Sequence, residues 1–218
     1  MNAETQTVVQ FIIGQAKQTP GIILKRNIRD YLATVERILY SCADSHISSS
    51  TINNFTLPIT TFRKQICYDL QGKADVIFCF DYVSLWHDFG RHSIQQNGNA
   101  KVMARNVDYD EESAFSEWNE TLFKNASIPL LVVPFAGVQS GKDFLLIEGN
   151  HRFETILRNN VENVSVKAFP DFAVVRNYVY GKFQRNLYIF LNQIPKLVCD
   201  PSPIINIGDC LSLFEIRA

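Results

Sequence analysis

The run from Phe144 to Phe169 constrains the fold of this 218-residue chain more than any other segment. It opens with a short apolar stretch, FLLI, which is typical of a buried strand. A polar turn, EGNHR, comes next. Apolar residues then recur at the spacing of one helical face, at Phe153, Ile156 and Leu157. The final stretch, VSVKAF, alternates as a half-buried strand does. We therefore predict a strand–turn–helix–strand unit.

The EGNHR turn has the composition of an anion-binding and catalytic site. The first N–H groups of a helix lack intrahelical partners and carry the positive end of the helix dipole, which suits a phosphate bound near Asn150. Gly149 permits a tight turn and a close approach to the backbone. Arg152 offers a planar fork for phosphate oxygens. His151 can transfer a proton near neutral pH, and Glu148 can hold Mg²⁺ or act as a base. The alternative is a surface turn in which Glu148 only pairs with Arg152.

The wider pattern resembles the ParB/sulfiredoxin superfamily. The residues that carry the resemblance are the run LLIEGNHRFETILRNNVENVSVKAF and the preceding SIPLLVV. Members of that superfamily have a strand, an acidic-Gly-x-(His/Arg)-Arg turn, a helix and a second strand. The resemblance spans residues 74–170 and is best over Ile128 to Phe169. It implies an α/β (α+β) fold with a small mixed sheet.

The superfamily also implies roles for single positions of the turn. Gly149 and Arg152 match the two fixed points of a turn that cradles nucleotide phosphates or engages nucleic acid. Sulfiredoxins have a catalytic cysteine where this chain has Asn150, so thiol chemistry is not expected. Partition proteins have an Arg-rich turn and a helix-turn-helix domain, and we see neither. The turn is similar to the Asp-Gly-His-His-Arg turn of free-serine kinases, and plasmid fertility-inhibition proteins share the fold.

We accordingly expect a cytoplasmic protein that binds the phosphates of a nucleoside triphosphate or of DNA. Hydrolysis of ATP or of DNA phosphodiesters with Mg²⁺, as in plasmid fertility inhibition, is the first hypothesis. The catalytic candidates are Glu148, His151 and Arg152, with Glu148 as the metal ligand. The phosphate-binding candidates are Gly149, Asn150, Arg152 and Arg91. A non-catalytic nucleotide-, nucleic-acid- or protein-binding module is one alternative, and a small-molecule kinase of the serine type is another.

The flanking regions divide the chain into three expected parts. Residues 1–54 form a helical N-terminal extension with helices over 5–18 and 27–42, followed by a polar loop; this extension is a candidate site for a protein partner. Residues 55–170 form the ParB/sulfiredoxin-like core, with strands predicted at 74–80 and 128–135 and a helix at 110–124. Residues 171–218 are expected to form a helix, broken at Pro195, and a closing hairpin over 204–216, both packed on the core.

The stretch from Asp81 to Asn106 is predicted to be a long polar loop. Within it, Arg91 is a candidate second phosphate contact, and His87 and His92 are weaker candidates for metal binding. Further along, GVQSGKD looks like a phosphate-binding loop but is one residue too short, so a hairpin loop is the better interpretation.

Charge and composition add only broad bounds. The formal net charge of −1 gives no global argument for nucleic acid, although a local basic face remains open, for example where Arg176 and Lys182 alternate with tyrosines. The five cysteines are scattered without a metal-binding or disulfide pattern. The first residues lack the pattern of a secretory signal, and no apolar run is long enough to cross a bilayer, so we expect no membrane insertion.

Overall fold

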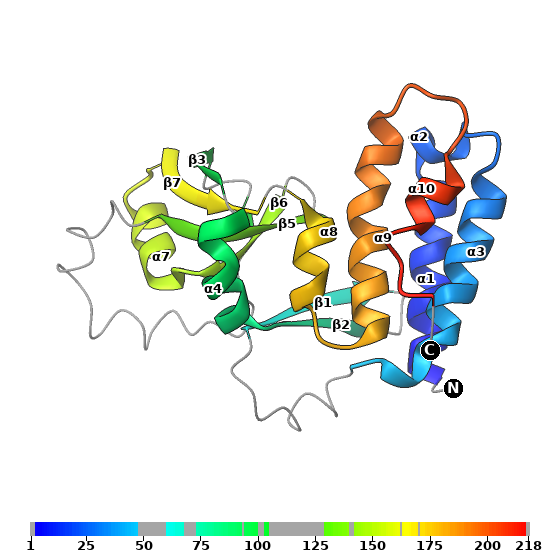
Figure 1. The fold of residues 1–218 in the computed structure, drawn as a ribbon, viewed down its shortest axis with the longest axis horizontal. Coiled ribbons are helices and arrows are strands. Elements are labelled where there is room, and N and C mark those ends of the chain that lie inside the picture. The colour runs from blue at the N-terminus through cyan, green and yellow to red at the C-terminus, as the bar shows by residue number, and fades with distance from the viewer. Residues whose placement is uncertain are drawn as a thin grey trace. The chain divides into compact units, whose positions relative to one another are not determined.

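The computed structural model describes residues 3–47, 60–67, 73–92, 94–99, 103–104, 129–139, 142–161, 163–169 and 171–216. The chain divides into two compact units (Figure 1). The helical unit draws on Met1–Thr56, Arg63–Phe78 and Val179–Ala218, and the sheet unit on Leu57–Phe62 and Cys79–Tyr178. The protein is therefore a mixed α/β protein with a helical N-terminus.

The sheet unit is built on a mixed sheet of five strands in the order β3-β7-β5-β6-β4. The strands are β3 (Ile94–Asn99), β4 (Met103–Ala104), β5 (Leu130–Gln139), β6 (Lys142–Glu148) and β7 (Asn163–Ala168). β5 pairs antiparallel with β6 and parallel with β7, so the chain that leaves β6 must pass β5 before it enters β7. Helix α7 (Asn150–Arg158) makes this crossing. The small mixed sheet and the strand–turn–helix–strand order are confirmed.

Helix α7 is held on the sheet by apolar side chains that recur on one of its faces. Phe153 is almost fully buried, and Ile156 packs against the same cluster. The other members of this cluster come from four strands and the residues beside them: Met103, Leu130, Val132, Leu146, Val164, Val166 and Ala168. In β7 every second side chain is buried, which is the alternation that the sequence predicts. The core therefore lies directly beneath the turn that begins α7.

The segment that looked like a phosphate-binding loop lies at the β5–β6 connection. Gln139 pairs with Lys142 across the two antiparallel strands, so the connection is a hairpin, as predicted. The strands are longer than expected, because β5 continues to Gln139 and β6 begins at Lys142.

The polar loop that we predicted over 81–106 is wrong in most of its described part. Residues Tyr82–His92 form helix α4, and Ile94–Asn99 form strand β3. Asp81 starts α4 because its carboxylate accepts hydrogen bonds from the backbone N–H and the hydroxyl of Ser84, at 3.0 and 2.7 Å. β3 is a polar edge strand, IQQNGN, so hydrophobic alternation could not reveal it.

The helical unit brings both ends of the chain together. Its helices are α1 (Ala3–Gln18), α2 (Pro20–Ile23), α3 (Ile28–Ser41), the short η1 (Ala43–Ser45), α9 (Lys182–Cys199) and α10 (Ile207–Leu211). α9 packs against α2 and α3, and α1 packs against α3 (Figure 1). The two N-terminal helices were predicted and are confirmed. The expected extension is thus part of a unit that also contains the C-terminal helix.

Helix α9 is the centre of this unit, and four of its polar side chains, Gln184, Asn186, Asn192 and Gln193, are buried. Tyr31 donates a 2.6 Å hydrogen bond to Gln193 Oε1, and Gln193 Nε2 donates to the carbonyl of Cys210 at 2.7 Å. Gln184 Nε2 donates to the carbonyl of Ile47 at 3.0 Å. Buried polar groups cost free energy unless they are paired, so these bonds fix where α3, Ile47 and α10 lie on α9.

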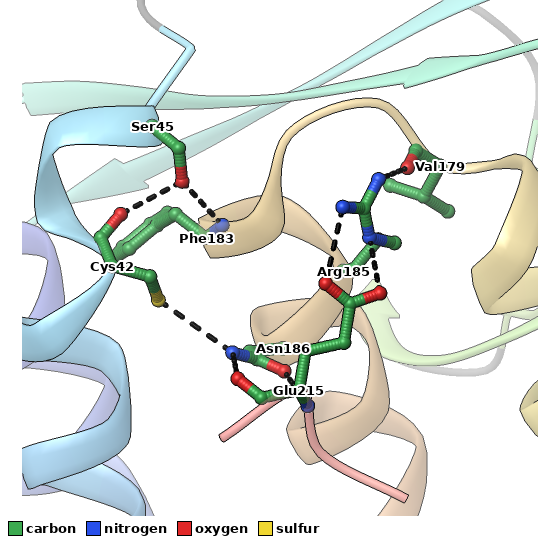
Figure 2. A network of polar contacts seen from close by, with 7 residues as sticks. All are labelled: Cys42, Ser45, Val179, Phe183, Arg185, Asn186 and Glu215. Atoms are coloured by element: carbon green, nitrogen blue, oxygen red, sulfur yellow. Dashed lines mark hydrogen bonds and ion pairs between the residues drawn. The ribbon is translucent and has the colours of Figure 1, made fainter. Parts of the chain in front are cut away.

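The C-terminal segment is anchored by a polar network on α9 (Figure 2). The buried side-chain amide of Asn186 accepts from the backbone N–H of Glu215 at 2.9 Å and donates to the backbone carbonyl of Glu215 at 3.3 Å. These are the two kinds of hydrogen bond that a neighbouring strand would make with Glu215. Arg185 pairs with the Glu215 carboxylate at 2.8 Å and donates to the carbonyl of Val179 at 3.0 Å. The backbone around Glu215 is therefore satisfied by side chains.

The C-terminal predictions need three corrections. The single helix that we predicted is interrupted, since α8 (Phe172–Val175) and η4 (Arg176–Tyr178) precede α9. Gly181, which lies between η4 and α9, has a φ of +80°. Pro195 lies inside α9 and does not end it, because burial of the helix outweighs one lost hydrogen bond. The hairpin over 204–216 is wrong, since α10 is helical and Asn206 caps it.

Two short strands complete the described elements. β1 (Thr60–Cys67) and β2 (Lys73–Phe80) form a two-stranded sheet. The strand predicted at 74–80 is thus confirmed, whereas the helix predicted over 110–124 lies outside the described residues. Among the helices that the structure describes, none combines the length and the apolar character needed to cross a bilayer.

Candidate functional site

The turn between β6 and α7 depends on the backbone of Gly149. Its φ of +102° and ψ of 25° place it in the left-handed region, where residues with a Cβ are strained. Its carbonyl accepts the first helical hydrogen bond, from the N–H of Phe153 at 2.9 Å. Gly149 is therefore the N-cap of α7 and turns the chain from the strand directly into the helix.

Two side chains lie tightly against this glycine. A Cβ added at Gly149 would lie 2.8 Å from Leu130 Cδ2 and 2.9 Å from Arg152 Nη2. A side chain at this position would displace the ends of these two side chains and would be strained by the φ angle. The second distance also shows that the Arg152 guanidinium folds back over the turn.

Arg152 is held in this position by Glu148, the last residue of β6. Nη2 of Arg152 donates to Glu148 Oε2 at 3.2 Å, four residues back along the chain. The Arg152 side chain is only 11% exposed, whereas that of Glu148 is 46% exposed. The pair therefore presents its carboxylate to solvent and keeps its guanidinium against the backbone.

The N-terminus of α7 lacks a capping side chain. The N-cap residue is Gly149, which has no side chain to offer. The first backbone N–H groups of a helix are available to an external acceptor in that case. Asn150 occupies the first helical position, and its buried Oδ1 has no hydrogen-bond donor within the described part of the chain.

The remaining predicted residues divide between placed and undescribed ones. His151 lies in the first turn of α7, next to Arg152 in the sequence, but its side chain lies outside the described part. Arg91 belongs to α4 and not to a loop, and its side chain is likewise not described. The structure therefore brings together Glu148, Gly149 and Arg152, and it leaves the roles of His151 and Arg91 as predictions.

The segment around His87 has a structural use that the sequence did not reveal. Tyr178 donates a 2.6 Å hydrogen bond to Asp88 Oδ2 and so fastens α4 to η4. Burial, this hydrogen bond and the charges of Asp88 and Asp81 together raise the pKa of Tyr178 to about 12. Asp88 is thus committed to a tyrosine, while His87 is exposed on the same helix.

A second Glu–Arg pair on α7 gives a reference for the first. Arg158 Nε donates to Glu154 Oε1 at 2.8 Å, again at a spacing of four residues. This pair lies at the C-terminal end of the helix, where the dipole disfavours an anionic ligand. Glu148–Arg152 therefore differs from an ordinary i, i+4 pair by its place at an uncapped helix N-terminus.

No preformed metal cage is present in the part of the chain that the structure describes. There, no three His, Cys, Asp or Glu side chains converge as metal ligands. Mg²⁺ is commonly held by only one or two carboxylates together with substrate phosphates. The half-exposed carboxylate of Glu148 suits that mode of binding.

Two aromatic residues of the basic and aromatic run near α9 cannot stack on nucleic-acid bases. Phe183 and Tyr188 are fully buried in the helical unit. Arg185 is engaged by Glu215 and by the carbonyl of Val179. Stacking on nucleic-acid bases requires exposed aromatic faces, so these residues serve the core.

Comparisons with known proteins do not extend this description. No protein-family model, no curated protein and no solved structure matches the chain. The likeness to the ParB/sulfiredoxin superfamily accordingly stays an expectation from the motif.

Proposed function

We propose that the turn from Glu148 to Arg152 binds the phosphate group of a nucleoside triphosphate or of DNA. The observation that carries the proposal is the position of the Arg152 guanidinium, which is almost buried against the left-handed Gly149 at the uncapped start of α7. A guanidinium beside a helix N-terminus favours an anion with several oxygens.

The Arg152 guanidinium keeps spare hydrogen-bonding capacity for a phosphate. Glu148 already supplies one carboxylate to Arg152, at 3.2 Å. A planar guanidinium has further N–H groups, so a phosphate can be added on the side of the helix N-terminus while the ion pair stays in place.

Mg²⁺ would be held between Glu148 and the phosphate oxygens. The donor set fits this mode, because one exposed carboxylate and a phosphate provide the hard oxygen ligands that Mg²⁺ prefers. When bound, the ion would offset phosphate charge and orient a water molecule. Arg152 and the helix N-terminus would stabilise the developing charge, and His151 would transfer the proton. The reaction is hydrolysis of ATP or of a DNA phosphodiester.

The Glu148–Arg152 ion pair also favours a second candidate function. A carboxylate that stays engaged with the arginine is not available to hold a metal ion, and binding without turnover is then the outcome. In this alternative the turn holds a nucleotide or nucleic acid, and the protein acts as a binding module.

Glu148→Gln separates the two functions. Glutamine keeps the shape and can still accept from Arg152, but it removes the negative charge. If Glu148 holds Mg²⁺, the variant loses Mg²⁺-dependent hydrolysis of ATP and plasmid DNA and retains, or gains, ATP binding measured without metal. Phosphate release and plasmid nicking assays give the first readout, and calorimetry gives the second.

Each outcome of this experiment decides between the functions. Wild-type binding without any phosphate release or nicking selects the binding module. Hydrolysis that persists unchanged in Glu148→Gln contradicts the role of Glu148, and absence of ATP and DNA binding in the wild type contradicts the proposal as a whole.

A further inference from the structure

A cavity lies in the helical unit, between the N-terminal helices. The cavity has a volume of about 540 Å³ and is lined by residues of α1, α2 and α3: Lys17, Ile23, Ile28, Arg29, Leu32, Ala33 and Glu36. Leu32 and Ile28 are buried and form its apolar floor. We call this cavity the basic groove because of the charges at its rim.

The rim of the basic groove carries more positive than negative charge. Lys17 comes from α1 and Arg29 from α3, and the described part of the chain provides neither with an ion-pair partner. Glu36 is the single acidic residue of the lining. From Lys17 to Arg29 the sequence contains four cationic residues and no acidic one. An anionic group at this rim is therefore favoured over a cationic one.

One of the four cations of this stretch lies beneath the surface. Lys25 is 6% exposed, and its Nζ donates to the carbonyls of Asp200 and Ser202. Carbonyl groups satisfy its hydrogen bonds but do not cancel its charge. Lys25 therefore adds to the positive field of this end of the unit without being available for contact.

Apolar surface continues beyond the groove. Ile23, at the rim, is 54% exposed, and the adjacent Leu24 is 77% exposed. Val198 of α9 packs against Gly21 and is itself 39% exposed. Clustered exposed aliphatic residues beside a pocket are typical of a surface that another macromolecule covers.

We propose that the basic groove binds an acidic, amphipathic helical segment of a partner protein. One apolar side chain of the segment fills the cavity above Ile28 and Leu32, and its neighbours one turn away cover Ile23 and Leu24. Acidic residues flanking the apolar face meet Lys17 and Arg29. Glu36 sets the direction of the segment, because it repels an acidic residue at its own end of the groove.

The shape of the site decides between this partner and other anionic surfaces. A small ligand would occupy the cavity but leave Leu24 uncovered. A bilayer presents no side chain that could fill a concave pocket, and a nucleic acid backbone would not be drawn to an apolar floor. A helical segment can fill the cavity with one side chain, cover the exposed aliphatic residues with others and pair its acidic residues with the charged rim.

A charge-biased peptide library tests the proposal. The library fixes leucines at i, i+4 and i+7 in an alanine-rich helix and varies the flanking positions among Glu, Gln and Lys. Selection on the full-length protein is expected to enrich peptides with Glu at the flanks. Fluorescence anisotropy of one enriched peptide, and of its Glu→Lys counterpart, then measures the preference.

Two variants on α3 provide a matched pair for the charge. Arg29→Glu reverses a charge in the groove, and Arg37→Glu makes the same change on the exposed part of the helix outside it. We expect Arg29→Glu to lower the affinity for the enriched peptide by about tenfold or more. We expect Arg37→Glu to change that affinity by about twofold or less. Ile23→Ser, at an exposed position, is expected to weaken the peptide without lowering the melting temperature.

Several results would overturn the proposal. These are enrichment without a preference for Glu, equal loss in Arg29→Glu and Arg37→Glu, or full binding by Ile23→Ser. A groove closed by a second copy would show as a dimer that Ile23→Ser dissociates, and a membrane site as binding to anionic vesicles that Arg29→Glu abolishes. Either finding would replace the peptide with another occupant.

Discussion

Gly149 is the residue on which the candidate site most depends. Its φ of +102° strains a residue with a Cβ, and a Cβ there would displace the ends of the Leu130 and Arg152 side chains. The same constraint makes the residue a structural requirement of the turn, whatever ligand the turn binds. Its replacement therefore tests the geometry of the site independently of the proposed chemistry.

Gly149→Ala is expected to lower the free energy of unfolding by about 1–3 kcal/mol, through backbone strain and displacement of the two neighbouring side chains. Gly14→Ala is the matched control. Gly14 lies within α1 with nothing within 4 Å of an added Cβ, so alanine there should stabilise by about 0.5–1 kcal/mol. Urea denaturation of both variants gives the comparison. Equal effects of the two substitutions would contradict the described turn.

His46 provides the clearest pH dependence. Burial lowers the pKa of His46 from 6.5 to about 4, and Thr5 Oγ1 lies 2.9 Å from Nδ1. Since the folded pKa lies below the unfolded one, the unfolded chain binds the proton more tightly. Stability is then fully present above pH 6.5 and falls as the pH drops from 6.5 towards 4. Partial solvent access reduces the loss to about 2 kcal/mol.

His46→Gln keeps a hydrogen-bonding group near Thr5 and cannot be protonated. Its free energy of unfolding should fall less steeply than that of the wild type between pH 6.5 and pH 4. Chemical denaturation at a series of pH values measures both slopes. Parallel slopes for the two proteins would show that His46 does not titrate as its burial requires.

At the scale of elements, α9 shows how distant residues complete a helix. Gly181 precedes α9 and offers no capping side chain. The hydroxyl of Ser45 fills the role, since it accepts from the N–H of Phe183 at 2.9 Å and donates to the carbonyl of Cys42 at 2.8 Å (Figure 2). The start of α9 is therefore fixed by η1, more than a hundred residues earlier in the chain.

Ser45→Ala is expected to cost about 1 kcal/mol, because a helix N–H loses its acceptor. Ser41→Ala is the control. Its hydroxyl only donates back to the carbonyl of Ile38 within α3, so its loss should be close to neutral. Hydrogen exchange at Phe183 should rise in the first variant and stay unchanged in the second. Unchanged exchange in both would contradict the cap.

Periodic elements were predictable from the sequence, and elements defined by tertiary contacts were not. α3 and β7 have buried residues at the spacing that their sequences show. β3 is polar along its length and is a strand only because it pairs with β7. Residues 204–216 contain apolar runs that suggest strands, but Asn206 caps a helix there instead.

The candidate site was predictable in its location and less so in its geometry. The order of strand, glycine and helix predicts where the turn lies, because a glycine at the start of a helix is visible in the local sequence. The return of Arg152 over Gly149 depends on Leu130 and on Glu148, and such packing is set by the sheet. The sequence predicted the N-terminal helices but not the basic groove, because the groove exists only where α1, α2 and α3 meet.

At the scale of the whole molecule, the middle of the chain forms one unit and its two ends form most of the other. Asn186, Arg185 and Glu215 close the helical unit around α9, and the Gly149 turn belongs to the sheet unit. The two proposals thus concern different units. Substitutions in the basic groove should leave nucleotide binding intact, and substitutions at the turn should leave peptide binding intact.

Phosphate binding at the turn is tested most directly by comparing Arg152 and Arg158, the two arginines of α7 that pair with a glutamate four residues earlier. Calorimetric titration with ATP compares wild type, Arg152→Gln and Arg158→Gln, after circular dichroism shows that each is folded. We expect Arg152→Gln to lower the affinity for ATP by about tenfold or more, and Arg158→Gln to change that affinity by about twofold or less. Equal affinities in all three proteins would contradict phosphate binding by this turn.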